Sequence, residues 1–366
     1  MIIGKHTLKP GKMPFVIAEI GTAHQGDIIK AKELIDAAKD SGADCAKFQI
    51  VFAEEILHPK TGVISLPGGF INLFDIFKKL EKDRFFYEEL KLYTEKKGLI
   101  FLASAFGRKS LGILEGLKVD AIKIASPENN YFGLMQKAAE LNLPVFFSTG
   151  VSKLADIEEA LEYLPKQVVL FHCITSYPSP EEEYNLTLLK TLSQIFGVPA
   201  AVSDHSTDPS LVPLVAMTQG AVAIEKHFTL SRKDDGLDDL IALPPQLFKK
   251  MTDDLQTGSK LQENELQSYL DQNYGAQRIQ QVLGNGIKKL APSEKDNYAT
   301  TRRSIHAWDS LPVGTTLTEK NLAILRSEKN LEPGLHPRYW NQIIGRKTTR
   351  FVEAGQGIIW DDLLTK

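Results

Sequence analysis

The chain has 366 residues, of which 43% are hydrophobic and 24% are charged, which is ordinary globular composition. It is longer than one typical domain, and a large domain followed by a small one is the natural division. The net charge of −3 gives no sign of a surface for nucleic acid or anionic membranes.

The start of the chain, Met1 to Lys5, lacks the long apolar core of a signal peptide, and no run is long enough to cross a bilayer. The two cysteines, Cys45 and Cys173, do not have metal-knuckle spacing, so neither a disulfide framework nor a zinc ribbon is expected. We therefore expect a cytoplasmic protein without a membrane partner.

Short apolar runs alternate with amphipathic stretches over the first two thirds of the chain. This alternation predicts a parallel sheet covered by helices on both faces. Eight such units in about 250 residues match a (β/α)8 TIM barrel better than an open doubly wound sheet. The expected strands are Phe15–Ile20, Cys45–Gln49, Ile100–Ala103, Ala121–Ile124, Val145–Ser148, Val168–His172, Ala200–Ser203 and Ala223–Lys226. The expected helices include Asp27–Ser41, Arg84–Lys97, Ser152–Tyr163, Pro209–Gln219 and Pro244–Leu255.

The segment Val51–Lys82 is longer than a usual connection between a strand and a helix. Long loops on this side of a barrel enzyme often cover the site. The segment fits equally well an insertion that has no role in the site, and the sequence leaves both interpretations open.

The composition changes after the last expected helix. Lys260–Asn297 is polar and is typical of a linker with some helix, and Ser304–Trp308 then has the pattern of a strand. Gly314 and Gly355 each precede an apolar residue by three positions and an Asn/Asp-Leu pair by seven and eight, which predicts a small module with two similar arms. We expect a catalytic barrel at residues 1–285, a linker at 286–300 and a β-rich C-terminal domain at 301–366.

Polar residues cluster directly after the expected strands and are rare before them. The active sites of barrels lie at this carboxyl end. Burying so many polar groups costs several kcal/mol unless they serve a ligand or one another, so we favour a site over a structural ion-pair network. The residues are Glu19, Lys47, Gln49, Ser104, Lys123, Ser126, Glu128, Ser148, Thr149, His172, Ser203, Asp204, His205, Glu225, Lys226 and His227.

Lys47 and Lys123 follow two nonadjacent strands and are expected to point into one barrel mouth. Two ammonium groups with the hydroxyls of four serines suit a ligand that carries both phosphate and carboxylate. Each lysine alone has a simpler interpretation as the partner of Glu19 or Glu128. A rival hypothesis makes one lysine a Schiff-base nucleophile, as in metal-free aldolases.

His205 and His227 end the seventh and eighth expected strands, which are neighbours in a closed barrel. Two imidazoles with acidic groups nearby can hold a divalent ion and leave positions for water and substrate oxygens. An oxygen-rich site without thiolates favours Mn²⁺, Mg²⁺ or Co²⁺ over structural zinc. We interpret His172 either as structural or as a residue that supports the site from behind the ligand-binding side chains.

These motifs resemble the sialic acid synthase family, which includes legionaminic and pseudaminic acid synthases. The end of the chain, at Arg302–Ser304, Pro333–Pro337 and Ile344–Gly345, resembles that family's antifreeze-like (SAF) domain. The resemblance extends over the whole chain in order and spacing. It rests on Glu19–Gly26, Gly42–Gln49, Lys123–Glu128, Ser148–Gly150, Tyr177–Pro178, Ser203–Ser206 and Ile224–Leu230.

The resemblance implies a barrel whose mouth holds phosphoenolpyruvate, Mn²⁺ or a similar ion, and an open-chain amino sugar. His205 and His227 match the metal ligands, and Glu128 matches a carboxylate proposed for proton transfer. The positions matching phosphoenolpyruvate-binding residues are Lys47, Lys123, Ser104, Ser126, Ser148 and Ser203. The positions matching residues that bind the sugar or shape the site are Glu19, Gln49, Tyr177, Glu225 and Asp238.

The family implies a homodimer in which the SAF domain of one subunit caps the barrel of the other and donates an arginine to the sugar. Arg326 is the nearest match to that arginine, although the family's arginine-proline-glycine is absent after it. Ala23 and Gln25 stand where the family has asparagines, and Asp239 stands where a histidine is frequent. These differences lie near the sugar end of the site.

The leading hypothesis is that the chain condenses phosphoenolpyruvate with N-acetylmannosamine and releases phosphate. An alternative within the same chemistry is a diacetamido-trideoxyhexose acceptor that leads to legionaminic or pseudaminic acid. A metal-free lysine aldolase and a non-catalytic sugar-binding module are the remaining hypotheses.

Overall fold

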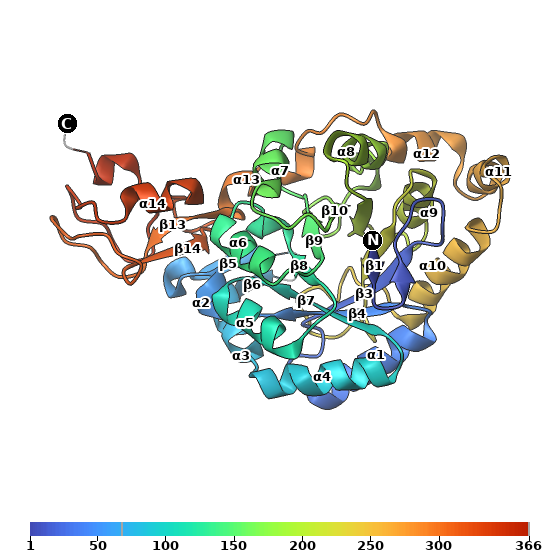
Figure 1. Ribbon diagram of the computed structural model, residues 1–366, viewed down its shortest axis with the longest axis horizontal. Coiled ribbons are helices and arrows are strands. Elements are labelled where there is room, and N and C mark those ends of the chain that lie inside the picture. Colours follow the sequence, from blue (N-terminus) through green and yellow to red (C-terminus); the bar gives the residue numbers. More distant parts are fainter. Residues whose placement is uncertain (67–68, 365–366) are drawn as a thin grey trace.

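The computed structural model describes residues 1–66 and 69–364. Eight parallel strands close a barrel in which each strand pairs with its neighbours in chain order, as Figure 1 shows. The predicted barrel is therefore confirmed. Its strands are β3 (Phe15–Gly21), β4 (Cys45–Ile50), β7 (Ile100–Ala105), β8 (Ile122–Ile124), β9 (Val145–Ser148), β10 (Val168–His172), β11 (Ala200–Asp204) and β12 (Ala223–His227).

Helices surround the barrel because each buries one apolar stripe against the outer face of the sheet. In α1, Leu34 and Ile35 are fully buried, and Asp27 caps the first turn by accepting hydrogen bonds from two backbone N–H groups. The surrounding helices are α1 (Ile28–Asp40), α4 (Arg84–Lys96), α5 (Arg108–Leu117), α6 (Phe132–Glu140), α7 (Leu154–Leu161), α8 (Leu188–Phe196), α9 (Leu211–Thr218) and α10 (Pro245–Gly258).

The inside of the barrel is packed with side chains, and its amino end is closed. Phe146 and Phe171 fill the interior, with ring centroids 5.1 Å apart. An N-terminal hairpin, β1 (Ile2–Ile3) and β2 (His6–Thr7), adds Ile3 to the same apolar cluster. Ligands therefore reach the interior from the carboxyl ends of the strands.

The long segment after β4 folds into its own small unit beside the mouth. It contains α2 (Ala53–Ile56), an antiparallel hairpin of β5 (Val63–Leu66) and β6 (Gly69–Asn72), and α3 (Leu73–Leu80). Leu73 and Phe77 pack in one apolar cluster with Phe106, which follows β7. The segment is thus joined to the barrel rim through a core of its own.

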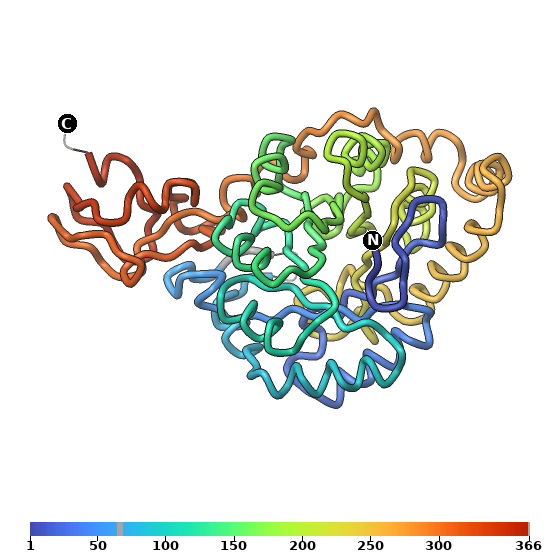
Figure 2. Tube along the Cα trace, viewed as in Figure 1, coloured from blue at the N-terminus to red at the C-terminus, as the bar shows by residue number. Residues whose placement is uncertain are grey.

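The polar stretch after α10 contains more helix than the sequence analysis expected. It forms α11 (Glu263–Tyr274) and α12 (Ala276–Leu283), which pack against α9. Leu266 and Leu270 are buried although most of α11 is polar. The chain then crosses the barrel towards the C-terminal domain, as the orange part of the trace in Figure 2 shows, with α13 (Asn297–Thr300) near its end.

The C-terminal domain, residues 301–364, lies to one side of the barrel (Figure 1) and contains β13 (Arg303–Ala307), the antiparallel β14 (Leu322–Arg326) and α14 (Trp340–Ile343). The two similar arms pair with each other through bridges between Leu311 and Val352 and between Thr316 and Lys347. Equivalent apolar residues of both arms lie in one core, namely Leu317, Leu322, Ile358 and Leu363.

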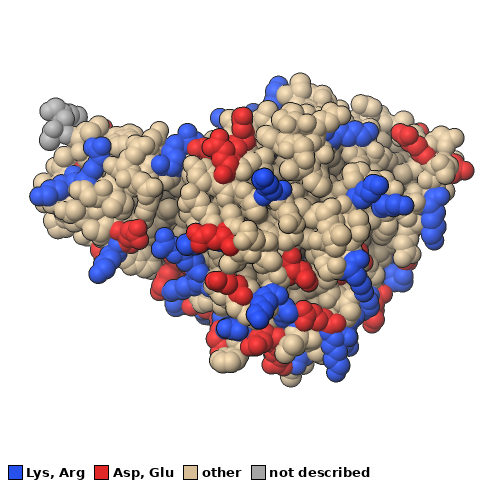
Figure 3. Space-filling model, viewed as in Figure 1, with Lys and Arg blue, Asp and Glu red and all other residues tan. Residues whose placement is uncertain are grey.

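Acidic and basic side chains are interspersed over the face drawn in Figure 3. Among the described residues, the helices are too short or too polar to span a membrane.

Candidate active site

A cavity of about 780 Å³ opens at the carboxyl ends of the strands. The residues that were given a binding, catalytic or metal role line it, with the exception of Glu128, whereas Thr149, His172, Asp204 and Lys226, which also follow strands, do not. Those that do are Glu19, Lys47, Gln49, Ser104, Lys123, Ser126, Ser148, Tyr177, Ser203, His205, Glu225, His227, Asp238 and Arg326. The rule that a barrel site lies at its strand ends therefore locates this group correctly.

Lys47, at the middle of β4, lies between two carboxylates. Its Nζ is 2.8 Å from Oε2 of Glu19 and 3.5 Å from Oε1 of Glu225, and all three side chains are buried. Gln49 donates a hydrogen bond to Glu19 at 2.8 Å. Burial disfavours the ammonium form, but the two carboxylates outweigh it and raise the pKa of Lys47.

Lys123, on β8, reaches the same carboxylate from the other side. Its Nζ lies 3.0 Å from Oε2 of Glu225 and 3.8 Å from the centroid of the Phe171 ring. Burial lowers the pKa of Lys123, and Glu225 only partly opposes this. The predicted convergence of Lys47 and Lys123 is thus present, with Glu225 between them.

Glu225 is an anion held by these two lysines. Burial opposes its ionisation, but Lys123 and then Lys47 lower its pKa to about 2. Ser203 also donates a hydrogen bond to Glu225 at 3.1 Å. The charges of Glu19, Glu225, Lys47 and Lys123 balance one another, so an added polyanion would need a further positive charge.

The predicted serines line the cavity beside the lysines. Ser104 and Ser203 lie 3.4 and 3.5 Å from the Nζ atoms of Lys47 and Lys123. Ser126 accepts a hydrogen bond from the backbone N–H of Gly150 at 3.1 Å and lies 3.0 Å from the sulfur of Cys173. Cys173 also lines the cavity, and the sequence analysis missed it although it directly follows β10.

His205 and His227 face each other across the mouth with ring centroids 5.4 Å apart. The carbonyl oxygen of Ile174 lies 2.7 Å from Nδ1 of His205. A proton on Nδ1 leaves Nε2 free to bind a metal ion, and burial, followed by the effect of His227, lowers the pKa of His205 to about 3. The imidazole is therefore neutral, as a metal ligand must be.

Other groups near the histidines are a tyrosine and an aspartate. Tyr177 stacks on His205 with centroids 4.4 Å apart, and a carboxylate oxygen of Asp238 lies 3.7 Å from Nδ1 of His227. Within the described parts of the chain, no three His, Cys, Asp or Glu side chains are grouped so as to hold an ion by themselves. His205 and His227 therefore fit an ion that takes its remaining ligands from water and substrate.

Glu128 does not line the cavity, where the resemblance places it for proton transfer. Its carboxylate also pairs with two arginines instead of Lys123, so its simpler interpretation as the partner of that lysine is wrong. The 3₁₀ turn Ser126–Glu128 directs its carboxylate into the contact with the C-terminal domain, where it is fully buried. Its Oε1 accepts hydrogen bonds from Arg303 at 2.8 Å and from Arg326 at 2.7 Å. This geometry makes Glu128 a partner of two arginines, remote from the lysines.

Arg326, at the end of β14, links this contact to the cavity. One of its terminal nitrogens binds Glu128, the side chain lines the cavity, and its buried Nε has no hydrogen-bond partner among residues 1–66 and 69–364. The C-terminal domain therefore contributes a cation to the cavity of its own barrel.

The sequence analysis also missed an apolar wall on one side of the cavity. We use this name for Ile71, Leu73, Ile76 and Phe77 of β6 and α3 together with Leu237 from the loop after β12. Ile71, Ile76 and Leu237 pack against the cluster that contains Leu73 and Phe77. The segment Val51–Lys82 thus helps to form the site, which decides between its two interpretations.

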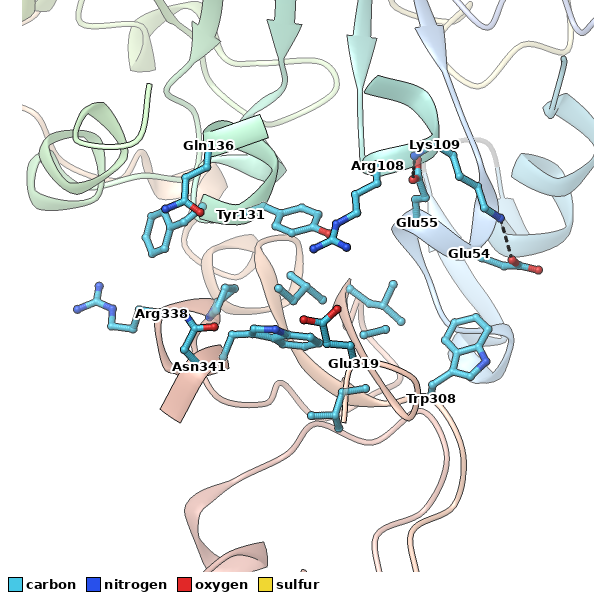
Figure 4. A pocket seen from close by; sticks show the side chains of 18 of the residues that line it. Glu54, Glu55, Arg108, Lys109, Tyr131, Gln136, Trp308, Glu319, Arg338 and Asn341 are labelled. Carbon is cyan, nitrogen blue, oxygen red and sulfur yellow. Dashed lines mark hydrogen bonds and ion pairs between the residues drawn. The ribbon is translucent and has the colours of Figure 1, made fainter. Parts of the chain in front are cut away.

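A second cleft, of about 620 Å³, lies between the barrel and the C-terminal domain. Figure 4 shows Arg108, Tyr131 and Gln136 of the barrel facing Glu319 and Asn341 across it. None of the predicted site residues lines this cleft.

Two family models match the chain: the NeuB family over residues 34–266 and the SAF domain over residues 302–364. The chain is 33% identical to the spore coat polysaccharide biosynthesis protein SpsE of Bacillus subtilis, over 96% of this chain and 94% of that protein. It is 32% identical to the N,N'-diacetyllegionaminic acid synthase of Campylobacter jejuni, over 93% of this chain and 97% of that enzyme.

Solved structures agree with these matches over most of the chain. The crystal structure of SpsE from Bacillus subtilis superimposes with a TM-score of 0.83 at 31% identity and covers 100% of this chain and 99% of that one. The sialic acid synthetase of Leptospira borgpetersenii superimposes with a TM-score of 0.62 at 29% identity and covers 81% and 94%.

Proposed function

The chain belongs to the NeuB family and carries a SAF domain at its C-terminus, and from this premise we propose that it is a nonulosonic acid synthase. It condenses phosphoenolpyruvate with an amino sugar aldehyde, N-acetylmannosamine or a relative of it, and releases phosphate. The observation that carries the proposal is the convergence of Lys47, Lys123, His205 and His227 in one cavity.

The lysine end of the cavity suits phosphoenolpyruvate. Lys47 and Lys123 contact Glu225 from two sides. A ligand with a carboxylate and a phosphate would give each ammonium group an anionic oxygen partner, as Glu225 does. Ser104 and Ser203 accept hydrogen bonds from the two lysines, and their hydroxyl groups can in turn donate to a ligand. Bound there, the lysines would offset the charge that develops as phosphate departs.

The histidine end suits a divalent ion, for which Mn²⁺ is the first candidate and Mg²⁺ or Co²⁺ are alternatives. The free Nε2 of a neutral His205 and the adjacent His227 are its protein ligands. When bound, such an ion supplies a positive charge that polarises the aldehyde oxygen. Glu19, Glu225, Lys47 and Lys123 balance one another in charge, so a divalent ion in the same cavity would offset part of the negative charge that phosphoenolpyruvate adds.

The reaction balances without an oxidant or a cofactor that carries electrons. Carbon 3 of phosphoenolpyruvate forms a bond to the aldehyde carbon, and the aldehyde oxygen takes a proton. Water then adds at carbon 2, and phosphate leaves with the oxygen that joined it to that carbon. Glu19, which lies 2.8 Å from Nζ of Lys47, is the candidate to hold a proton in these steps, because the lowered pKa of Glu225 keeps that carboxylate ionised.

The apolar wall favours a second acceptor. Partly buried side chains such as Ile71, Ile76 and Leu237 line one side of the cavity. Such surfaces accommodate a methyl group or an acyl methyl group better than a hydroxyl group, which would lose hydrogen bonds to water. This supports a diacetamido-trideoxyhexose acceptor, and hence a legionaminic- or pseudaminic-type product, beside N-acetylmannosamine.

A homodimer that exchanges its C-terminal domains is part of the proposal. Arg326 lines the cavity of its own barrel in a single chain, and an exchanged dimer would make the same contact between subunits. Mixing Lys123→Met and Arg326→Ala subunits after joint refolding tests this, because only exchange creates a complete site. Activity equal to the sum of the two separate variants would rule exchange out.

Phosphate release measured with phosphoenolpyruvate, each aldehyde and Mn²⁺ tests the function itself. We expect release that requires all three components and stops with a chelator. If the sugar acid formed without release of phosphate, and borohydride trapped an adduct between a lysine and the substrate, the chain would be a lysine aldolase instead.

A further inference from the structure

A single side chain of the C-terminal domain binds the backbone just before the apolar wall. The amide nitrogen of Asn330 donates hydrogen bonds to the carbonyl oxygens of Thr61 at 2.6 Å and Val63 at 2.7 Å. Both hydrogens of the amide are thereby used, because a side-chain NH₂ group has two donors. The two carbonyls lie on either side of Gly62, whose φ of +67° marks a sharp turn.

The bound backbone continues directly into the wall. Val63 is the first residue of β5 and pairs with Asn72, the last residue of β6. Asn72 caps α3 by accepting a hydrogen bond from the N–H of Asp75 at 3.3 Å. Ile71 and Leu73, on either side of Asn72, line the cavity. The contact of Asn330 with Val63 and the pairing of Val63 with Asn72 therefore connect Asn330 to the surface of the cavity.

Further contacts bind the earlier part of the same segment to the C-terminal domain. Nε2 of His58 lies 2.9 Å from the carbonyl oxygen of Trp308, and Nζ of Lys60 lies 2.8 Å from Oε1 of Glu353. Arg303 donates a hydrogen bond to the carbonyl of Glu55. Figure 1 shows α2 next to β14. Of these contacts, that of Asn330 lies nearest the wall along the chain.

We propose that Asn330 is a positioning residue that sets the affinity for the acceptor sugar by fixing the β5–β6 hairpin and, through it, Ile71 and Leu73. The phosphoenolpyruvate end is independent of this contact, because Lys47 and Lys123 lie on the barrel strands. The C-terminal domain thus acts on acceptor binding through backbone position as well as through Arg326. The inference rests on the proposed function, since it assigns the wall to the acceptor.

The test compares Asn330→Ala and Asn330→Asp in the full-length chain. Alanine removes both hydrogen-bond donors. Aspartate also places a carboxylate opposite two carbonyl oxygens, so Asn330→Asp should lower kcat/KM for the acceptor more than Asn330→Ala does. Asn341→Ala is the matched control, because Asn341 is exposed on α14 of the same domain. We expect kcat/KM for the acceptor to fall on the order of tenfold, the loss of two neutral hydrogen bonds. KM for phosphoenolpyruvate should stay within about twofold of its value in the unchanged protein, a much smaller change than the roughly tenfold fall expected for the acceptor.

Hydrogen exchange supplies a readout that does not depend on activity. In both Asn330 variants, the amides of Val63–Leu66 and Gly69–Asn72 should exchange faster, while those of β13 stay protected. Unchanged exchange in the hairpin, or equal losses for both substrates, would overturn the inference. If the parent protein releases no phosphate with any aldehyde, the proposed function is wrong, and the role of Asn330 in acceptor binding is wrong with it. The hydrogen-exchange data would still show whether Asn330 fixes the hairpin.

Discussion

Nζ of Lys123 lies 3.0 Å from Oε2 of Glu225 in the barrel mouth, and both side chains are buried. The second oxygen of the same carboxylate faces Lys47 at 3.5 Å. Glu225 therefore occupies a position between two ammonium groups in which an anionic substrate would find its partners. The contact therefore lies where we propose that phosphoenolpyruvate binds.

Replacing Lys123 by methionine should weaken phosphoenolpyruvate binding by at least about a hundredfold, the equivalent of about 2.7 kcal/mol for a lost charged contact. The variant should also lose stability, because Glu225 is left buried with a single ammonium partner. Adding Glu225→Gln should restore stability without restoring binding, as calorimetry and thermal unfolding would show. Lys137→Met, at an exposed lysine of α6, is the control, and binding by Lys123→Met that matches this control would refute the assignment.

Replacing His205 by alanine should reduce Mn²⁺ affinity by about 10- to 100-fold or more, because one of two protein ligands is lost. Titration of Mn²⁺ followed by electron paramagnetic resonance measures this without turnover. His172→Ala is the control, since His172 lies near the barrel mouth but contacts the carbonyl of Tyr184. Equal Mn²⁺ affinity in both variants would remove His205 from the metal site.

Replacing Glu128 by glutamine should loosen the C-terminal domain and leave the chemistry largely intact. The carboxylate is the common acceptor of Arg303 and Arg326, and breaking a buried ion pair costs about 3–5 kcal/mol. Limited proteolysis near residue 300 should therefore become faster, while the pH dependence of kcat stays the same. A lost limb of the pH profile with normal resistance to protease would instead support proton transfer by Glu128.

Acid should destabilise the fold through buried neutral histidines. Burial lowers the pKa of His306 to about 4, although its contact with the carbonyl of Gly355 opposes this. The unfolded chain, with a histidine pKa of about 6.5, binds more protons below that pH, so stability is present above pH 6.5 and is lost as the pH falls towards 4. His306 alone accounts for about 1.4 kcal/mol per pH unit in this range. Urea unfolding at several pH values should show a smaller slope for His306→Gln, and an unchanged slope would contradict the assignment.

The site residues on the barrel strands were predictable, because the end of a strand can be recognised in the sequence where an apolar run stops. Lys47, Lys123, His205 and His227 all follow this rule. Glu128 is an exception to this rule, because the 3₁₀ turn after β8 directs its side chain away from the cavity. A turn of this kind leaves no periodic pattern in the sequence.

The parts that depend on contacts between distant segments were not predictable. The apolar wall lies where the segment after β4 packs with Phe106, and Asn330 of the C-terminal domain contacts the same segment. The sequence predicts only some helix in the stretch after α10, because buried residues such as Leu266 and Leu270 are few among polar ones. The weak repeat in the C-terminal domain did predict paired arms, since equivalent residues share one core.

The central claim is that this cavity joins phosphoenolpyruvate to an amino sugar with cleavage of the bond between carbon and oxygen. Phosphoenolpyruvate labelled with ¹⁸O at the bridging oxygen tests it most directly, with Mn²⁺ and the aldehydes present. We predict that the label appears in the released phosphate, with one new nine-carbon acid formed per phosphate. Unlabelled phosphate, or phosphate released without the acid, would contradict the account.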